Sequence, residues 1–250
     1  MSENQKKIWI TGASSGIGKA VAEKFAKEGW QVAVSARRKE LLEDMAKNPN
    51  ISSYPLDVVN EENCLNIFEK IISDFTKIDL CIFCSGTYDP KKEKGIDLEQ
   101  NRFVMDVNYL GVLNCVKAVE KYFKNKRNGH ISIVSSIAGY RGLPNSSGYG
   151  PSKAALNNFA ESIFFDFKKY NVRISVISPG FIKTPLTDKN DFPMPFLKSV
   201  EYAAEKIYNG LTKSNSFEIH FPKQLTLILK FLRILPYKIY LFLIYKLYKR

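Results

Sequence analysis

The sequence predicts an α/β fold built on one doubly wound parallel sheet with helices on both faces. Short apolar stretches alternate with longer amphipathic stretches across residues 7–221, and a glycine-rich segment follows the first of them. Alternating strands and helices are typical of a parallel sheet with right-handed crossovers. A chain of 250 residues suits one such domain with a single core. We therefore expect about seven strands in one domain over residues 1–221, followed by a basic amphipathic helical tail over residues 222–250.

The expected elements follow the two hydrophobic periods, two residues for strands and about 3.6 for helices. Strands are expected near residues 7–11, 31–35, 51–55, 78–84, 130–135, 172–178 and 217–221. Helices are expected near residues 16–28, 38–47, 61–75, 99–124, 149–169 and 199–212. Ligands bind at the carboxyl ends of the strands in such a sheet, so the candidate site residues are those at strand ends and at the helix starts that follow.

The first strand, Lys7–Thr11, leads into a glycine-rich turn. Gly-Ala-Ser-Ser-Gly-Ile-Gly occupies residues 12–18, and a helical pattern begins there. Glycine allows positive φ and close approach of a ligand to the backbone, while the free amides of a helix start favour an anion. The arrangement predicts a pyrophosphate site formed by Gly12, Ser14, Ser15, Gly16, Ile17 and Gly18.

The second strand ends in a basic pair, Arg37 and Arg38. In a dinucleotide-binding sheet this position faces the adenosine ribose, where an acidic residue would hold a free 2′-hydroxyl. Guanidinium groups match phosphate oxygens instead, so the pair favours NADP(H) over NAD(H). The alternative is that both arginines only solvate the start of the next helix.

The fourth strand contains a C-x-x-C sequence formed by Cys81 and Cys84. Side chains alternate along a strand, so residues three apart point to opposite faces. This geometry predicts buried, apolar cysteines and no metal site or disulfide. Together with Cys64 and Cys115, they suit a reducing cytoplasm.

Tyr149 and Lys153 form the most informative pair in the sequence. A separation of four residues places them on one face of a helix. A free tyrosine has a pKa of about 10, and a neighbouring ammonium lowers that pKa toward the working range of an acid–base catalyst. Ser136 ends a strand thirteen residues before Tyr149, where it is placed to hold a substrate oxygen. Ser135, one residue earlier, is the competing candidate.

Together these pieces resemble the short-chain dehydrogenase/reductase family. The resemblance covers roughly the first 220 residues and rests on motifs in the family's order and spacing, namely Thr11–Gly18, Asp57, Asn108, Ser136, Tyr149, Lys153 and the Pro179–Gly180 pair. It implies a Rossmann-like fold and an NAD(P)-dependent oxidoreductase acting on CH–OH and C=O groups. It also implies that Tyr149 exchanges the proton, that Lys153 tunes the tyrosine and binds the nicotinamide ribose, and that Ser136 binds the carbonyl oxygen.

The resemblance assigns further residues to the adenine half and to the proton path. It implies that Arg37 binds the 2′-phosphate with Arg38 as helper. Asp57 and Val58 would border the adenine, unless Asp57 simply caps the following helix. Asn108 would hold a water that relays protons to the lysine, and its alternative is a surface group or a helix kink.

The resemblance also assigns residues around the nicotinamide. Gly86 would permit close approach of the cofactor after the fourth strand. The segment with Pro179, Gly180, Ile182 and Thr184 would face the nicotinamide ring, although Pro-Gly is also an ordinary turn signal. One departure stands out, because typical members carry Asn-Asn-Ala-Gly where this chain has Phe-Cys-Ser-Gly over residues 83–86. The missing asparagines usually bind backbone between central strands, so another group must take that role.

The tail, residues 222–250, differs in composition from the rest of the chain. It holds seven Lys or Arg and no Asp or Glu, which is +7 of the net charge of +12. Its longest uninterrupted apolar run, residues 239–245, is far shorter than the about 20 residues that span a membrane. Pro236 divides the tail, so two helices are expected near 223–234 and 237–249. Their character predicts a peripheral membrane contact, and the alternatives are packing on the protein's own body or on a second subunit.

The expected substrate is a small carbonyl or alcohol compound. Apolar side chains follow the sixth strand between residues 181 and 196, which favours a hydrophobic or lipidic ketone such as a long-chain 3-oxo compound. The resemblance implies a homodimer through the helices expected at 99–124 and 149–169. The polar N-terminus is not a signal peptide, so the expected location is cytoplasmic, at the membrane face.

Two other classes of function are weighed against an enzyme. Nucleic-acid binding would use the same positive charge, but the hydrophobicity of the tail argues against it. A non-catalytic NADP(H)-binding scaffold or sensor at a membrane surface is the main alternative. The presence of all four expected catalytic residues argues against that alternative.

Overall fold

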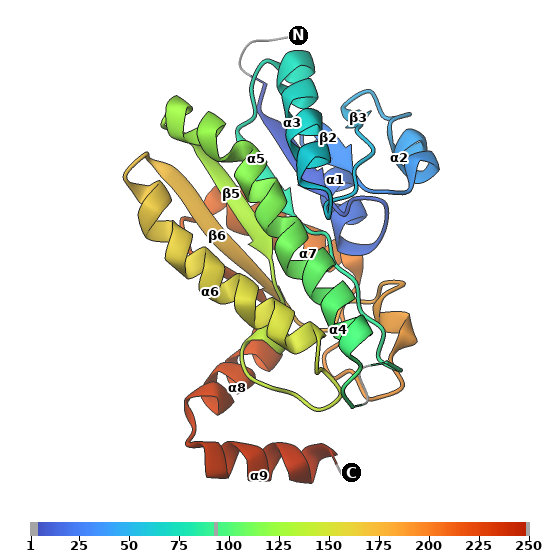
Figure 1. Ribbon diagram of the computed structural model, residues 1–250, viewed down its shortest axis with the longest axis vertical. Coiled ribbons are helices and arrows are strands. Elements are labelled where there is room, and N and C mark those ends of the chain that lie inside the picture. The colour runs from blue at the N-terminus through green and yellow to red at the C-terminus, as the bar shows by residue number, and fades with distance from the viewer. Residues whose placement is uncertain (1–4, 93–94, 249–250) are drawn as a thin grey trace.

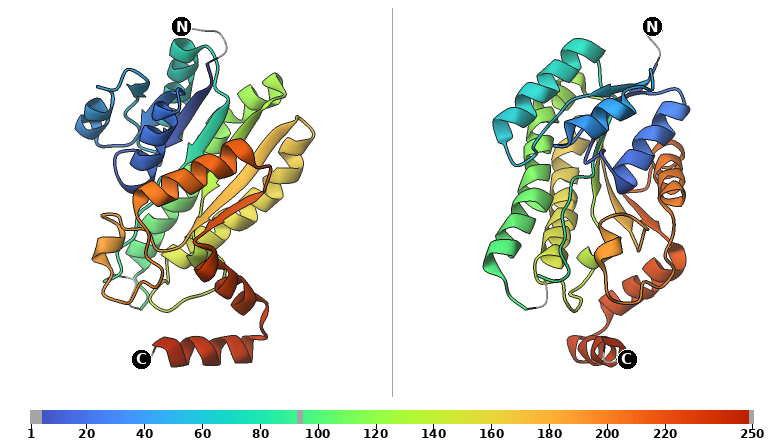
Figure 2. Two further views of the ribbon diagram at one scale, coloured as in Figure 1. Left: turned by 180° about the vertical axis from the view of Figure 1, so that it is seen from behind. Right: turned by 90° about the vertical axis from the view of Figure 1, so that its right-hand side faces the viewer.

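A seven-stranded parallel sheet forms the centre of the protein in a computed structural model, which describes residues 5–92 and 95–248 (Figures 1 and 2). The strand order is β3-β2-β1-β4-β5-β6-β7. The chain therefore moves outward from β1 to β3, returns to β4, and moves outward again to β7 in the opposite direction. This reversal leaves a crevice at the carboxyl ends of β1 and β4, where dinucleotides bind in this architecture. The predicted doubly wound, Rossmann-like fold is confirmed.

The strands begin and end close to the predicted positions. They are β1 (Lys7–Thr11), β2 (Gln31–Ser35), β3 (Ile51–Ser53), β4 (Leu80–Phe83), β5 (Gly129–Val134), β6 (Val172–Pro179) and β7 (Glu218–Phe221). The helices are α1 (Gly16–Lys27), α2 (Lys39–Met45), α3 (Glu61–Phe75), α4 (Leu98–Met105), α5 (Gly111–Lys126), α6 (Tyr149–Lys168), α7 (Val200–Lys213), α8 (Lys223–Ile234) and α9 (Tyr237–Tyr248). Strand β3 is shorter than predicted because, at the edge of the sheet, it pairs only with β2.

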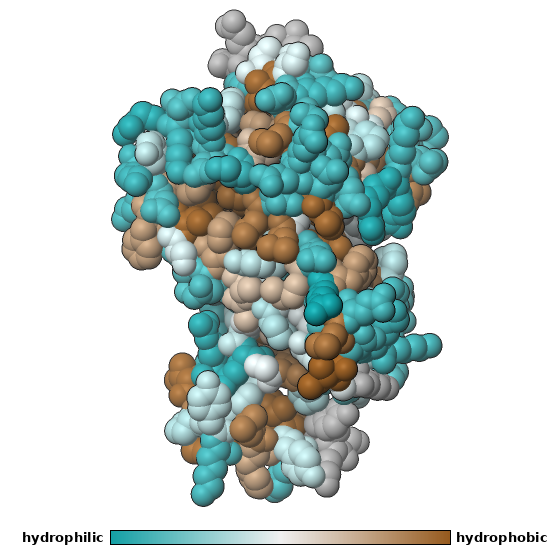
Figure 3. Space-filling model, viewed as in Figure 1, coloured by the Kyte–Doolittle hydropathy of each residue, from teal (hydrophilic) through white to brown (hydrophobic). Residues whose placement is uncertain are grey.

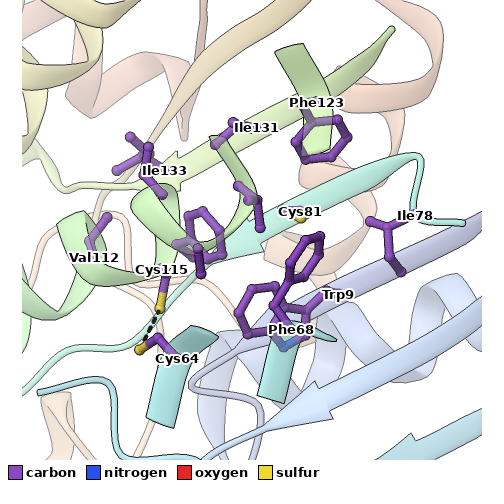
Figure 4. Close-up of a cluster of buried hydrophobic side chains, with 14 of the residues drawn as sticks. Trp9, Cys64, Phe68, Ile78, Cys81, Val112, Cys115, Phe123, Ile131 and Ile133 are labelled. Carbon is purple, nitrogen blue, oxygen red and sulfur yellow. Dashed lines mark hydrogen bonds between the residues drawn. The ribbon is translucent and has the colours of Figure 1, made fainter. Parts of the chain in front are cut away.

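Alternating strand side chains fill two apolar layers. On one face Trp9 and Phe83 pack with α3, α5 and α6, and Figure 4 shows part of this layer. On the other face Ile8 and Ile10 pack with α1, α2 and α7. Cys81 lies in the first layer and Cys84 packs against the second, as expected for residues three apart in a strand. Burial raises the pKa of Cys84 to about 11, so this thiol stays protonated at neutral pH.

One expected helix differs in detail. The helix predicted over 99–124 contains a π-helical turn, Asp106–Leu110, between α4 and α5. Asn108 in this turn is fully buried, and its Oδ1 accepts a hydrogen bond from the Thr87 amide (2.7 Å). Its Nδ2 donates to the Thr87 carbonyl (3.0 Å) and to Ser152 Oγ (3.1 Å). Single π-helical turns redirect side chains and are frequent at functional sites, and here one holds an amide against the loop after β4.

That contact also bears on the departure at residues 83–86. The loop after β4 lacks the family's asparagines, but Asn108 pairs with both backbone groups of Thr87. Asn108 therefore provides from a neighbouring helix a side-chain anchor for this backbone. The amide and the carbonyl of Thr87, two backbone groups of this loop, both have a hydrogen-bond partner in this way.

The tail packs partly on the body of the protein. Leu225 and Thr226 in the first turn of α8 are buried, and α9 lies across the end of the molecule below the sheet (Figures 1 and 2). Tyr240 of α9 is buried. Many large apolar side chains on these two helices are instead exposed, namely Leu227, Ile228, Phe231, Ile234, Tyr237, Ile239, Leu241, Phe242, Tyr245 and Leu247. In Figure 3 apolar and polar groups both reach the surface at this end.

The two tail helices match their predicted ranges, except that residue 249 lies outside the described residues. Within the described ranges, no helix is both long and apolar enough to cross a membrane.

Candidate active site

One cleft brings together nearly all of the predicted site residues. It lies at the carboxyl ends of β1, β4, β5 and β6 and has a volume of about 310 Å³. Its lining includes Gly12, Ser14, Ser15, Gly16, Ile17, Gly18, Arg37, Arg38, Asp57, Val58, Gly86, Ser136, Tyr149, Lys153, Pro179, Gly180, Ile182 and Thr184. Asn108 is the exception, and it lies directly behind the lining, since a Cβ on Gly86 would be 3.5 Å from its Oδ1. A cleft of this size suits a small organic ligand.

The glycine turn at the start of α1 packs closely against neighbouring backbone. Gly12 has a φ of +68°, and a Cβ there would be 2.7 Å from the Cys84 carbonyl. A Cβ on Gly18 would be 2.4 Å from the Gly12 oxygen. Side chains are thus excluded at both positions. Ser15 precedes the helix and its side chain makes no capping hydrogen bond, so the first amides of α1 are not satisfied by that hydroxyl. Helix starts of this kind bind phosphate groups.

Arg38 lies against this turn. Its Nη2 donates to Ser14 Oγ (2.7 Å) and Ser15 Oγ (2.7 Å), and its Nε donates to Ser14 Oγ (3.1 Å). Arg37 also lines the cleft and is exposed. Two guanidinium groups therefore border the end of the cleft at β2, as required for a phosphate beside the ribose.

Asp57 does not cap the helix that follows it. Its Oδ1 accepts from the Val59 amide (3.2 Å), while the N-cap of α3 is Asn60, whose side chain accepts from the Asn63 amide (2.8 Å). The structure therefore does not support the alternative role of Asp57 as the cap of α3. Val58 beside it packs tightly on the first turn of α5, since a Cβ on Gly111 would be 2.6 Å from Val58 Cγ2.

Tyr149, Lys153 and Ser136 converge at the other end of the cleft. Tyr149 is the first residue of α6, and its ring packs at a tilted angle against Tyr88, with the ring centres 5.0 Å apart. The Lys153 Nζ is 5.7 Å from the centre of the Tyr149 ring and donates to the Val134 carbonyl (2.9 Å). Lys153 is only 4% exposed, and this burial lowers its pKa to about 8. A proton donor and a cation thus share one face of α6 at the cleft.

The two serines after β5 have different partners. Ser136 Oγ accepts from the Ala138 amide (3.1 Å), which orients the hydroxyl and leaves its proton available for donation. Ser135 Oγ instead donates to the Lys153 carbonyl (2.9 Å). Ser135 is therefore committed to holding α6, and Ser136 is the serine with a proton to offer a ligand.

Sequence reasoning missed several residues at this site. Tyr88 packs against Tyr149 from a loop that has no regular pattern. Thr187 Oγ1 donates to the Ile182 carbonyl (2.6 Å) and accepts from the Thr184 amide (2.9 Å), which fixes the segment after β6. The two threonines three residues apart were a usable signal, because such hydroxyls commonly bond nearby backbone in turns.

A family model described as short chain dehydrogenase matches residues 6–193. The chain belongs to this family. It is 33% identical over 232 residues to an uncharacterized oxidoreductase of Myxococcus xanthus, with 91% of each chain covered. It is 32% identical over 185 residues to a 3-oxoacyl-acyl-carrier-protein reductase of Thermotoga maritima, covering 72% of this chain and 75% of that protein.

Solved structures of short chain dehydrogenases share the fold. One from Burkholderia cenocepacia in complex with NADP has a TM-score of 0.80 and 26% identity, and the match covers 94% of this chain and 95% of that one. As a member of the short chain dehydrogenase family, this protein is an NAD(P)-dependent oxidoreductase that acts on a small molecule.

Proposed function

We propose that this short chain dehydrogenase is an NADP(H)-dependent carbonyl reductase for a hydrophobic ketone. The observation that carries the proposal is the convergence of Tyr149, Lys153 and Ser136 on the same cleft that the glycine turn and two arginines line. One end of the cleft suits an anionic nucleotide, and the other end offers acid–base groups. Reduction is the favoured direction because cells usually keep the NADP(H) pool reduced.

The residues of the cleft fit a nicotinamide dinucleotide. The glycine turn and the start of α1, whose amides the Ser15 side chain does not cap, suit the pyrophosphate, and Arg37 and Arg38 suit a 2′-phosphate. Asp57 and Val58 would border the adenine. The nicotinamide would lie beside Pro179, Gly180, Ile182 and Thr184, and when bound the cofactor supplies the hydride.

The protein's own contribution is to bind the carbonyl oxygen and to supply a proton. Ser136 would donate a hydrogen bond to that oxygen and stabilise its developing charge. Tyr149 would donate the proton, and the Lys153 ammonium would stabilise the phenolate that remains. Asn108 would hold the loop at Gly86 beside Lys153 and take part in the water-mediated proton relay.

The pH dependence of reduction should report Lys153. The folded-state pKa of about 8 lies below the ordinary value of 10.5, so the ammonium loses its proton as the pH rises through 8. Because only the charged form stabilises the phenolate, kcat/KM for the ketone should fall about tenfold per pH unit above that point. A pH–rate profile measures this. In Lys153→Arg, which keeps its charge, the fall in kcat/KM should begin at a higher pH. A fall at the same pH as in the wild-type enzyme would assign it to another group.

An apolar substrate is supported by the segment after β6. Phe181 and Phe192 pack edge to face with ring centres 6.1 Å apart, and Phe192, Phe196 and Leu197 are exposed next to the cleft segment. The similarity to a 3-oxoacyl-acyl-carrier-protein reductase adds a relative whose name indicates a 3-oxo compound. We propose a long-chain 3-oxo compound as the substrate class.

A peripheral membrane contact through residues 223–250, at the cytoplasmic face, is part of the proposal. The exposed apolar side chains of α8 and α9 lie among Lys223, Lys230, Arg233, Lys238 and Lys246, with no acidic residue. Such helices lie in the interface of anionic bilayers. The loops at the carboxyl ends of the strands and α9 lie at the same end of the molecule (Figures 1 and 2). A homodimer through α5 and α6 is also proposed, supported by the exposed Phe165 on α6.

NADPH consumption with ketones of increasing chain length, with and without anionic vesicles, tests the proposal. Turnover should rise with chain length, and vesicles should raise it further for long-chain 3-oxo compounds. Adding salt should weaken this vesicle effect, because screening reduces the attraction between the basic tail and anionic lipid. Tight NADPH binding without turnover of any ketone would contradict the proposed carbonyl reductase and favour the non-catalytic scaffold or sensor. Turnover without any vesicle effect would contradict the membrane contact alone.

A further inference from the structure

We propose that Arg141 is a positioning residue that couples the tail to the substrate-binding side of the cleft. Arg141 lies in the segment 137–148, called here the linking segment because it joins Ser136 to Tyr149. The inference deepens the proposed function and rests on it. Four sets of contacts carry it.

The first set caps α8. Arg141 Nη1 donates to the carbonyls of Leu232 (3.1 Å), Arg233 (3.1 Å) and Leu235 (2.7 Å). The last carbonyls of a helix have no partner within the helix, and a cation at that end also stabilises the helix dipole. No acidic residue occurs in the tail, so it supplies no carboxylate to compete for this guanidinium. Arg141 therefore closes the C-terminal end of α8 from a segment about ninety residues earlier in the chain.

The second set fixes α9. The Arg141 guanidinium lies 4.4 Å from the centre of the Tyr237 ring and 4.0 Å from that of Tyr240, within the range of a cation–π interaction. Tyr240 is 3% exposed, and its hydroxyl donates to the Gly142 carbonyl (2.7 Å). The linking segment thus contacts α9 through two consecutive residues, so one side chain holds both tail helices.

The third set joins α8 to the linking segment. Leu225 of α8 packs with Ile137 and Tyr140 of that segment. The Tyr140 hydroxyl donates to Glu218 Oε1 (2.6 Å), and Lys230 of α8 pairs with the other oxygen of Glu218 (2.5 Å). An ionised carboxylate that receives both contacts holds the tyrosine and the helix together, and the hydrogen bond from Lys230 helps to lower the pKa of Glu218.

The fourth set joins α8 to the opposite wall of the cleft. A Cβ on Gly180 would be 3.0 Å from Leu225 Cδ2, so the first turn of α8 lies directly against this residue of the cleft lining. Phe181 packs in the same cluster and makes an edge-to-face contact with Phe192 farther along. The tail therefore contacts both segments that flank the catalytic end of the cleft, whereas the glycine turn at the other end has no part in these contacts.

Removing Arg141 should consequently affect the ketone and spare the cofactor. In Arg141→Ala the end of α8 loses its cap and both tail helices lose their contact with the linking segment. KM for a long-chain ketone should rise about tenfold, with kcat changed by less than about threefold. The Kd for NADPH should stay within about twofold, because the pyrophosphate and ribose contacts lie at the other end of the cleft.

Two variants serve as controls. Arg141→Lys keeps a charge but not the planar group that bonds and stacks at once, so it should restore only part of the loss. Arg233→Ala removes the same charge from an exposed position whose carbonyl, not its side chain, binds Arg141. Without vesicles it should behave as the wild-type enzyme.

Amide hydrogen exchange provides a readout that does not depend on turnover. With NADPH bound, peptides covering 140–148 and 232–240 should exchange faster in Arg141→Ala and unchanged in Arg233→Ala. Unchanged exchange in Arg141→Ala, or faster exchange with an unchanged KM, would overturn the inference. If the wild-type enzyme reduces no ketone, the proposed function fails, while the exchange result still decides whether Arg141 holds the tail.

Discussion

Tyr149→Phe is expected to lower kcat for ketone reduction by about 10²- to 10⁴-fold, the usual contribution of a general acid. The substitution keeps the ring that packs against Tyr88 and removes only the hydroxyl. Lys153, Ser136 and the glycine turn are untouched, so the Kd for NADPH should stay within about twofold. Stopped-flow measurement of the hydride-transfer step, alongside fluorescence titration with NADPH, separates the two quantities.

Tyr202→Phe provides a matched control for this experiment. Tyr202 lies on α7, and its ring packs edge to face on Phe221 in the layer opposite α6. Loss of its hydroxyl should leave kcat unchanged. If Tyr149→Phe weakened NADPH binding as much as it slowed turnover, Tyr149 would be a binding residue and not the proton donor.

Replacing both Arg37 and Arg38 by Ala is expected to lower kcat/KM for NADPH by about 10²-fold, because charge-assisted hydrogen bonds to a phosphate would be lost. The corresponding value for NADH, which has no 2′-phosphate, should change by less than about threefold. Initial rates with each cofactor at a fixed ketone concentration measure the two values.

The single variants determine which guanidinium matters more. The family resemblance favours Arg37, whereas the structure places Arg38 on the hydroxyls of Ser14 and Ser15. Lys39→Ala controls for a general loss of positive charge, since Lys39 pairs with Glu43 at the exposed start of α2. An equal fall for both cofactors would mean that the arginines support the fold and do not select the phosphate.

The fold was predictable because its signals are local. Each strand is a short apolar run, and the glycine turn lies where a strand must give way to a helix within a few residues. The spacing of Ser136, Tyr149 and Lys153 is likewise contained within eighteen residues, 136–153. The structure brings all three to the cleft, together with residues that follow five other strands.

The residues that sequence reasoning missed depend on contacts between distant segments. Asn108 itself was predicted as a site residue, but the π-helical turn that positions it and its contact with Thr87 were not. The hydrogen-bond partners of Asn108 and Arg141 lie 21 to 94 residues away in the sequence, and nothing in the local sequence identifies them. For the tail, the sequence left packing on the body of the protein as an alternative to a membrane contact, and buried Leu225 and Tyr240 show that it packs there in part.

The direction of the last strand gives the tail an importance beyond its own contacts. In a parallel sheet every strand ends at the same edge, so any chain added after β7 leaves the domain beside the ligand cleft. The residues proposed to bind the pyrophosphate, the 2′-phosphate and the adenine all lie before that point, after β1, β2 and β3. We therefore expect variation after β7 to change which compounds are admitted more than it changes binding of that part of the nucleotide. The topology therefore makes the segment after β7 a place where substrate specificity can change.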